Sequence, residues 1–296
     1  MKKLLSLLVV SIAIVFAGTA TAQAQQKEKI VTGTINYLTH TSMKILDEYM
    51  AGHMYSGGED SYMGWNLKVG AIYRKQENLS WDLYFTNIYQ PSGFMAEEPS
   101  LKNPAGTQHM DYSSYNFGYG TYYHWQFGKK LMIKAGGMLD FYGALKKTAP
   151  DGVNNAISLE GQILAKAHAA IKYGWDFKRW ALDIHGSVSL PVIGVITADH
   201  PSEPALCGLF GNDHTVLNPG MRHIFLGFYH NSMALDFEVG VDFVFRPCTI
   251  TLGFGGTNRW WKVYGLQNVR QITYATLGVS FDIVSRDKFK TTNKNF

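Results

Sequence analysis

The sequence predicts an all-β fold, a transmembrane antiparallel up-and-down β-barrel, and three observations carry that prediction. First, residues 233–245 alternate large apolar side chains with small or acidic ones, which is the two-residue period of a strand with one apolar face. Second, 14% of the residues are aromatic and 17% are charged, and the mean hydropathy of −0.10 is too low for helical membrane spans. Third, short turns and long loops alternate along the chain, as they do in bacterial barrels.

The N-terminal residues have the pattern of an export signal. Lys2 and Lys3 precede an apolar run, and the small-residue pattern Ala22-Gln23-Ala24 follows it, so we expect cleavage after Ala24. No later run of about 18 apolar residues is present to span a bilayer as a helix. We therefore expect a signal peptide in residues 1–24, an outer-membrane β-barrel in 25–284 and a polar C-terminal tail in 285–296. The expected location is the cell outer membrane.

Eleven segments alternate in a way that predicts strands. One of them, 30–46, alternates only weakly, and the alanine-rich segment 157–173 also has the length of a helix. Its polar residues Glu160, Lys166 and His168 do not gather on one helical stripe, so the strand is favoured. The predicted strands are 30–46, 65–74, 81–86, 115–127, 131–141, 157–173, 180–190, 224–228, 233–245, 250–254 and 275–283.

Tight turns and long loops separate these strands. Turns are predicted near 76–78, 128–129, 175–178 and 230–232, and loops at 47–61, 91–111, 146–156 and 197–219. Proline at positions 91, 99 and 104 argues against a ladder in the second loop. Because bacterial barrels have an even number of strands, we expect about twelve, with ten as the alternative. The loop at 197–219 is long enough for a twelfth strand or an inward-folded plug.

A soluble β-sandwich is the alternative architecture. It requires the apolar faces of 115–127 and 233–245 to share one core, and an export signal fits it equally well. In a barrel, the same faces meet lipid and the opposite faces line one lumen.

The polar residues on the inner faces are the candidate site. Both signs of charge are present, so we expect a hydrated, salt-bridged lumen or a narrow polar path for a small solute. The predicted lumen-lining residues are Lys68, Arg74, Asp82, Lys134, Asp140, Glu160, Lys166, His168, Asp183, His185, Asp236, Glu238, Asp242 and Arg246, with Lys172 and His223 as further members.

Catalytic motifs are sparse. His230 and Ser232 have the His-x-Ser spacing in which imidazole can activate a hydroxyl, with Asp236 and Glu238 as candidate orienting carboxylates. The outward face changes parity around residues 230–232, which places the pair at a corner. We expect no cofactor, because residues 253–256 are strand glycines rather than a phosphate-binding loop. We expect no metal either, because no structural zinc spacing occurs.

Several short stretches resemble a family of Bacteroidetes outer-membrane barrels described only as a domain of unknown function. They are Ala135-Gly136-Gly137-Met138-Leu139-Asp140, Asn154-Asn155, Leu190-Pro191-Val192-Ile193-Gly194-Val195, His230-Asn231, and Gly265-Leu266-Gln267-Asn268 through Gly278-Val279. The chain departs from the family pattern at Ala205–Phe210, where members carry a tyrosine-rich stretch. The resemblance implies the outer membrane and a barrel, and it implies no activity.

The expected function is a non-enzymatic narrow channel or a structural subunit of an envelope complex. The alternative is an outer-membrane lipid hydrolase, of the lipid A deacylase or phospholipase type, that uses His230 and Ser232. The expected partners are outer-membrane lipid and lipopolysaccharide, with other outer-membrane proteins as further candidates. The formal charge of +4 includes lysines of the signal peptide, so no nucleic-acid partner is expected.

Overall fold

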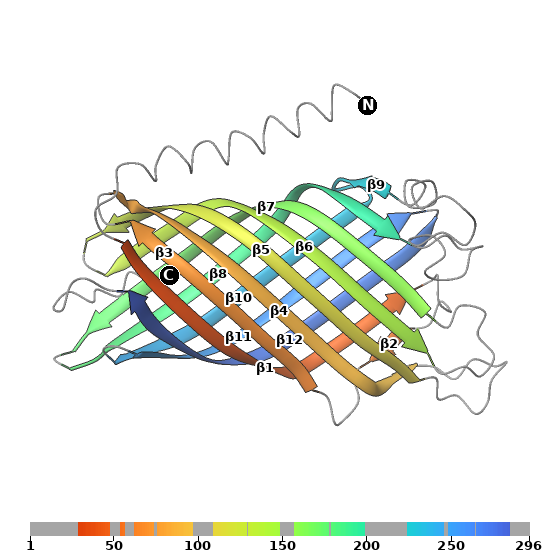
Figure 1. The fold of residues 1–296 in the computed structure, drawn as a ribbon, viewed down its shortest axis with the longest axis horizontal. Coiled ribbons are helices and arrows are strands. Elements are labelled where there is room, and N and C mark those ends of the chain that lie inside the picture. The colour runs from red at the N-terminus through yellow and green to blue at the C-terminus, as the bar shows by residue number, and fades with distance from the viewer. Residues whose placement is uncertain are drawn as a thin grey trace, which may run out of the picture.

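The described part of the computed structural model contains twelve antiparallel strands, and they form a barrel in which the strands are tilted relative to the barrel axis (Figure 1). The structure describes residues 29–47, 54–56, 62–73, 76–96, 109–128, 130–148, 157–177, 179–198, 224–245, 248–263 and 265–284. The predicted signal peptide, the tail and almost all of loop 197–219 lie outside these residues. The strands are β1 Lys29–Asp47, β2 Met54–Ser56, β3 Tyr62–Tyr73, β4 Gln76–Ala96, β5 His109–Phe127, β6 Leu131–Thr148, β7 Ile157–Asp176, β8 Ala181–Ala198, β9 Ile224–Gly227, β10 Ser232–Phe245, β11 Cys248–Val263 and β12 Leu266–Val284.

Ten strands close the barrel, in the order β1, β3, β4, β5, β6, β7, β8, β10, β11 and β12. Each pairs with its neighbour, and β12 returns to β1 from Val31↔Val284 to Asp47↔Asn268. The expected twelve strands are therefore present among the described residues, but the alternative count of ten is the one that describes the closed wall. The even number and the antiparallel up-and-down topology are confirmed.

The short strands β2 and β9 continue two wall positions at one end of the barrel. β2 pairs with β1 and β4 beyond the end of β3. β9 pairs with β8 at Gly194↔Gly227, whereas the ladder between β8 and β10 ends at Asp236↔Ser189. A turn at residues 228–231 connects β9 to β10. β2 lies inside the predicted loop 47–61, so that loop prediction was wrong over three residues.

Strands also run into the other three predicted loops: β5 begins at His109 and β6 extends to Thr148, and two further strands run through prolines. β4 continues through Pro91 to Ala96, and β8 continues through Pro191 to Ala198. Both prolines lie at register shifts, where the β4–β5 ladder skips residues 91–93 and the β7–β8 ladder skips Val192. A bulge does not need a ladder N–H at that point, so it tolerates proline. The turn predicted at 76–78 is likewise strand, since β4 begins at Gln76.

Most connections sort by length to opposite ends of the barrel. Residues 74–75, 128–130, 177–180 and 246–247 join strands at one end, which we call the short-turn end, and β1 begins and β12 finishes there. At the other end, the long-loop end, strands are joined by 97–108, 149–156 and 199–223, and also by two short connections, 228–231 and 264–265. Gly128 and Gly265 adopt positive φ angles of 64° and 79° in tight turns, a conformation that glycine adopts without steric cost.

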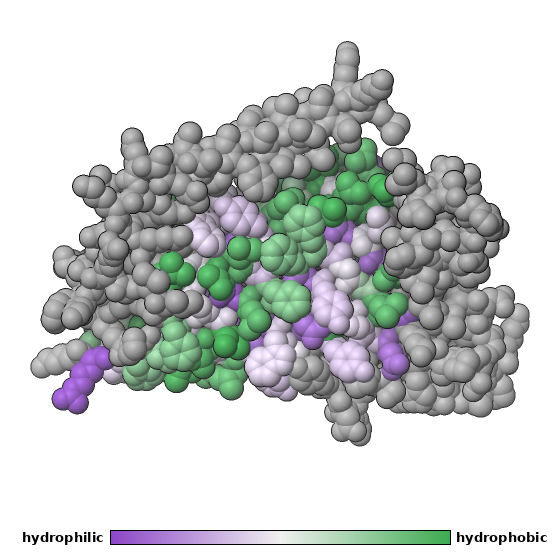
Figure 2. Space-filling view, in the orientation of Figure 1, coloured by the Kyte–Doolittle hydropathy of each residue, from purple (hydrophilic) through white to green (hydrophobic). Residues whose placement is uncertain are grey.

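The outer surface of the barrel is apolar around its whole circumference. In Figure 2 the visible wall is mostly green, with pale patches of aromatic residues. Outward side chains keep large exposed fractions, for example 51% for Ile35, 46% for Phe117 and 52% for Val239. At the short-turn end, aromatic pairs such as Tyr173–Trp175 and Phe177–Trp180 lie close together. An apolar belt bordered by aromatic residues is the surface expected to face lipid.

The described residues contain no helix that is long and apolar enough to cross a membrane.

A lysine on the apolar belt is predicted to destabilise the barrel. Val239 lies midway along β10 and faces outward, so Val239→Lys should lower the free energy of unfolding in lipid vesicles by about 2–4 kcal/mol. The matched control is Asn258→Lys on the neighbouring strand, where an exposed polar side chain is already present. Urea unfolding in vesicles measures both variants, and equal losses would contradict a lipid-facing Val239.

Candidate functional site

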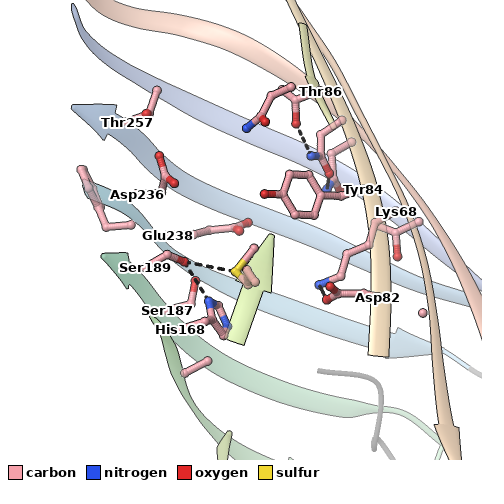
Figure 3. A pocket seen from close by; sticks show the side chains of 18 of the residues that line it. Lys68, Asp82, Tyr84, Thr86, His168, Ser187, Ser189, Asp236, Glu238 and Thr257 are labelled. Carbon is pink, nitrogen blue, oxygen red and sulfur yellow. Dashed lines mark hydrogen bonds and ion pairs between the residues drawn. The ribbon is translucent and has the colours of Figure 1, made fainter. Parts of the chain in front are cut away.

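A cavity of about 300 Å³ occupies the barrel lumen (Figure 3). Its walls include Thr32 of β1, Asp82 of β4, Lys134 of β6 and Asp242 of β10, all near the short-turn end of their strands. Tyr142, Arg259 and Arg270, which lie farther toward the long-loop end, also line it. The cavity therefore extends from the short-turn end of the lumen to the level of Tyr142, Arg259 and Arg270.

The structure places most of the predicted lumen residues inside the barrel. Lys68, Asp82, Lys134, His168, His185, Asp236, Glu238 and Asp242 line the cavity. Asp140, Glu160, Lys166 and Asp183 are buried inside the barrel, where they form hydrogen bonds or ion pairs. Lys172 pairs with Asp183 at 2.8 Å. Arg74, His223 and Arg246 lie outside the residues whose side chains are described.

A buried carboxylate at the centre of the lumen connects several strands. Asp140 of β6 forms an ion pair with Lys166 of β7 and a 2.9 Å ion pair with Arg259 of β11, and it accepts a 2.8 Å hydrogen bond from the Tyr84 hydroxyl of β4. Lys166 also pairs with Asp236 of β10 at 2.6 Å. These contacts cross the lumen, so they tie opposite parts of the wall together.

Glycine makes room for one of these side chains. A Cβ on Gly118 would overlap the Tyr84 ring, so the absence of a side chain on β5 allows the tyrosine to lie flat against the wall. This position sets the direction of the Tyr84 hydroxyl toward Asp140.

A second group of side chains fills the lumen toward the long-loop end. Lys146 lies 2.6 Å from Asp47 and 2.7 Å from Glu160, and Glu160 also accepts a 2.7 Å hydrogen bond from the Tyr142 hydroxyl. Arg270 donates to the hydroxyls of Tyr112 and Tyr142. We call this group, together with Arg259, the closing layer; its members are Asp47, Tyr112, Tyr142, Lys146, Glu160, Arg259 and Arg270.

Apolar side chains surround the closing layer inside the barrel. One cluster includes Leu38, Met43, Ile45 and Ile272, and another contains Ile196, Trp261 and Val263. Arg259 and Lys146 are each 1% exposed. In the part of the chain that the structure describes, the lumen at this level is therefore filled by side chains rather than by an aqueous path.

Sequence reasoning missed much of the closing layer. The predicted strands ended at residue 254 and resumed at 275, whereas β11 extends to Val263 and β12 begins at Leu266. Arg259 and Arg270 were therefore assigned to no predicted strand. The alternation of Thr257, Arg259 and Trp261 on one face was the signal available in the sequence.

One wall of the cavity consists of amides and hydroxyls. The Asn36 amide donates to Asn66 at 3.1 Å, and the Asn66 amide donates to Thr86 at 2.6 Å, which forms a ladder across β1, β3 and β4. Figure 3 shows Thr86 and Tyr84 on this side, with Asp236 and Glu238 facing them across the cavity.

The other walls carry charged and imidazole groups. Lys68 pairs with Asp82 at 3.0 Å, and the Lys134 ammonium lies 4.2 Å from the centre of the Tyr122 ring. His168 shares a 2.9 Å hydrogen bond with the Ser189 hydroxyl. The cavity thus presents both signs of charge to anything that enters it.

The predicted His-x-Ser pair is not assembled. His230 is exposed in the turn at residues 228–231, and its ring stacks at 6.0 Å on Phe228. Ser232 is 3% exposed, and its hydroxyl has no hydrogen-bond partner among the described residues. One side chain points outward and the other inward, because the turn breaks the strand alternation between them.

Another serine–histidine pair also lacks the arrangement of a triad. Ser80 and His124 are hydrogen-bonded and buried. The other ring nitrogen of His124 lies 3.3 Å from the Met132 sulfur, where a triad needs a carboxylate to orient the imidazole. Within the described ranges, no group of three or more histidine, cysteine, aspartate or glutamate side chains has the geometry to hold a metal ion.

An apolar exterior and a polar, cross-linked interior define a closed-lumen β-barrel of the outer-membrane type. The chain belongs to the family described as "Protein of unknown function (DUF3316)", whose model matches residues 4–285. This confirms the predicted membership of a family of unknown function. No curated protein matches the chain.

Solved barrels are similar in architecture. Outer membrane protease OmpT from Escherichia coli is 7% identical, with 87% of this chain and 97% of that chain covered and a TM-score of 0.45. Neisserial surface protein A is 11% identical, with 86% and 96% covered and a TM-score of 0.32. An outer membrane channel from Pseudomonas putida F1 is 10% identical, with 86% and 96% covered and a TM-score of 0.39.

Removing the central carboxylate is predicted to be strongly destabilising. Asp140→Asn leaves Lys166 and Arg259 buried with one counter-charge fewer, so the free energy of unfolding should fall by about 3–5 kcal/mol. The matched control is Asp82→Asn, whose partner Lys68 has a side chain that is 34% exposed and can be hydrated. Denaturant unfolding followed by tryptophan fluorescence measures both, and an equal or larger loss for the control would contradict this ranking.

Proposed function

We propose that this protein is an integral outer-membrane barrel without a permanently open pore, and that it serves as a non-enzymatic structural subunit of an envelope complex. The apolar belt supports insertion in a bilayer. The arrangement of short turns and strand ends at one end, with long loops at the other, supports the outer-membrane orientation with short turns toward the periplasm.

The closing layer is the observation that carries the proposal. Ions cross a barrel through water, and here Arg259, Lys146 and Arg270 are 1–3% exposed. Lys146 of β6 pairs with Asp47 of β1 and Glu160 of β7. Arg259 of β11 pairs with Asp140 of β6, and Arg270 of β12 donates to Tyr112 of β5. Displacing them would leave buried charges without partners, which costs several kcal/mol. A lumen closed in this way suits a protein whose outer surface and loops do its work.

A narrow, gated channel is the second candidate, and the cavity favours it. The side chains of Lys68 and Asp236 are 34% and 30% exposed, so the cavity leaves room for a small solute beside them. A solute path would then need only the closing layer to rearrange. The lipid-hydrolase alternative has less support, because His230 and Ser232 do not face each other.

Conductance separates the closed barrel from a channel. We expect the purified protein to give no stepwise conductance in a planar bilayer. The double substitution Arg259→Ala, Arg270→Ala removes both guanidinium groups of the closing layer and should produce stepwise openings. Arg179→Ala, at an exposed position in a short turn, is the control and should stay silent.

Stepwise conductance of the wild-type protein would contradict the proposal and favour the channel. If the protein is a structural subunit, we also expect a second protein to copurify with it in stoichiometric amount from outer membranes in mild detergent.

A further inference from the structure

One carboxylate in the cavity takes part in none of the described ion pairs. Glu238 of β10 lines the cavity, and among the described residues its carboxylate forms no hydrogen bond or ion pair. Its neighbours along the strand are engaged, since Asp236 pairs with Lys166 and Asp242 accepts a 2.6 Å hydrogen bond from Thr251. Figure 3 shows the Glu238 side chain extending into the open space. A carboxylate in a confined site needs a compensating positive charge.

Two ammonium groups lie on other walls of the same cavity. Lys68 comes from β3 and Lys134 from β6, and both interact electrostatically with Glu238 although neither forms an ion pair with it. The cavity therefore has Glu238 on one wall and the two lysines on others, and Asp82, which pairs with Lys68 at 3.0 Å, lies beside the lysines. A molecule that carries both charges can occupy this space without adding net charge.

Uncharged polar side chains also line the cavity. They include the amides of Asn36, Asn66 and Asn116 and the hydroxyls of Thr34 and Thr257. A few polar groups of this kind can fix the orientation of a small polar ligand.

Size and access restrict the ligand further. A cavity of about 300 Å³ is at the small end of ligand sites. The closing layer fills the lumen on the long-loop side of the cavity. We therefore expect a ligand to enter from the short-turn side.

We propose that the lumen cavity binds a small zwitterion of amino-acid size, with its ammonium group at Glu238 and its carboxylate toward Lys68 and Lys134. A simple cation would meet the two lysines, and a simple anion would meet Glu238. A neutral sugar would leave Glu238 without an ion-pair partner in a site of reduced polarity. The inference does not require the closed-barrel function, since a gated channel can hold the same site.

Calorimetric titration of the detergent-solubilised full chain tests this site with four probes. L-serine carries both charges, ethanolamine lacks the carboxylate, D-glycerate lacks the ammonium group, and glucose is neutral. We expect L-serine to bind at least about tenfold more tightly than each of the other three, because a charged hydrogen bond contributes about 1.5–3 kcal/mol and about 1.4 kcal/mol is tenfold.

The variant Glu238→Gln assigns the contact. It should weaken L-serine binding at least about tenfold and leave D-glycerate binding unchanged or tighter, because it removes the repulsion of an anion. Asp176→Asn, at an exposed position at the end of β7, is the charge-matched control and should bind L-serine as the wild type does. Resistance to SDS before boiling checks that each variant is folded.

Three outcomes would overturn the proposal. The first is that no probe releases or absorbs heat, and the second is that glucose or a singly charged probe binds as tightly as L-serine. The third is that folded Glu238→Gln binds L-serine as tightly as the wild type. Conductance reports on the proposed function separately. A conducting wild type that binds L-serine would reject the closed barrel and keep the site, and a silent wild type that binds nothing would do the reverse.

Discussion

The pairing of the first strand with the last is the constraint on which the rest of the structure depends. A sheet with free edges cannot sit in lipid, because each unpaired backbone N–H and C=O in hydrocarbon costs several kcal/mol. The β1–β12 ladder removes the two edges and makes the ten-stranded wall continuous. Once the wall is closed, the two-residue period of every strand assigns its side chains to lipid or to one shared lumen. The apolar belt and the charged interior are thus two consequences of one closure.

The interior of a ten-stranded barrel must be filled or hydrated, and this chain does both. Toward the long loops, arginine, lysine and tyrosine side chains reach across and satisfy one another, as in the contacts of Arg270 with Tyr112 and Tyr142. Toward the short turns, many inward side chains are short, such as Thr34, Ser187 and Thr251, and a cavity remains. The charges of the two halves meet at Asp140, which contacts Lys166 and Arg259. The position of long side chains along the strands therefore decides where the lumen is closed.

Much of this architecture could be predicted from the sequence, because alternation is a local property that needs no knowledge of partners. The strand at 233–245 and the inward placement of Asp140 and Lys166 follow from it directly. Two features could not be predicted in that way. Whether Pro91 or Pro191 ends a strand depends on a register shift in its pairing with the neighbouring strand, and this is a tertiary property. The closing layer was missed because β11 and β12 extend beyond their clearest alternation, to Arg259 and Arg270.

The most direct test of the account is the gel mobility of the protein extracted by detergent from purified outer membranes, with and without boiling. A closed barrel resists SDS until it is heated, so the account predicts a compact, faster band in the unboiled sample and a slower band after boiling, with both bands reactive to an antibody against the chain. Recovery of the protein from the periplasm without detergent, or a single band that boiling does not shift, would contradict a wall closed by β1 and β12 in lipid.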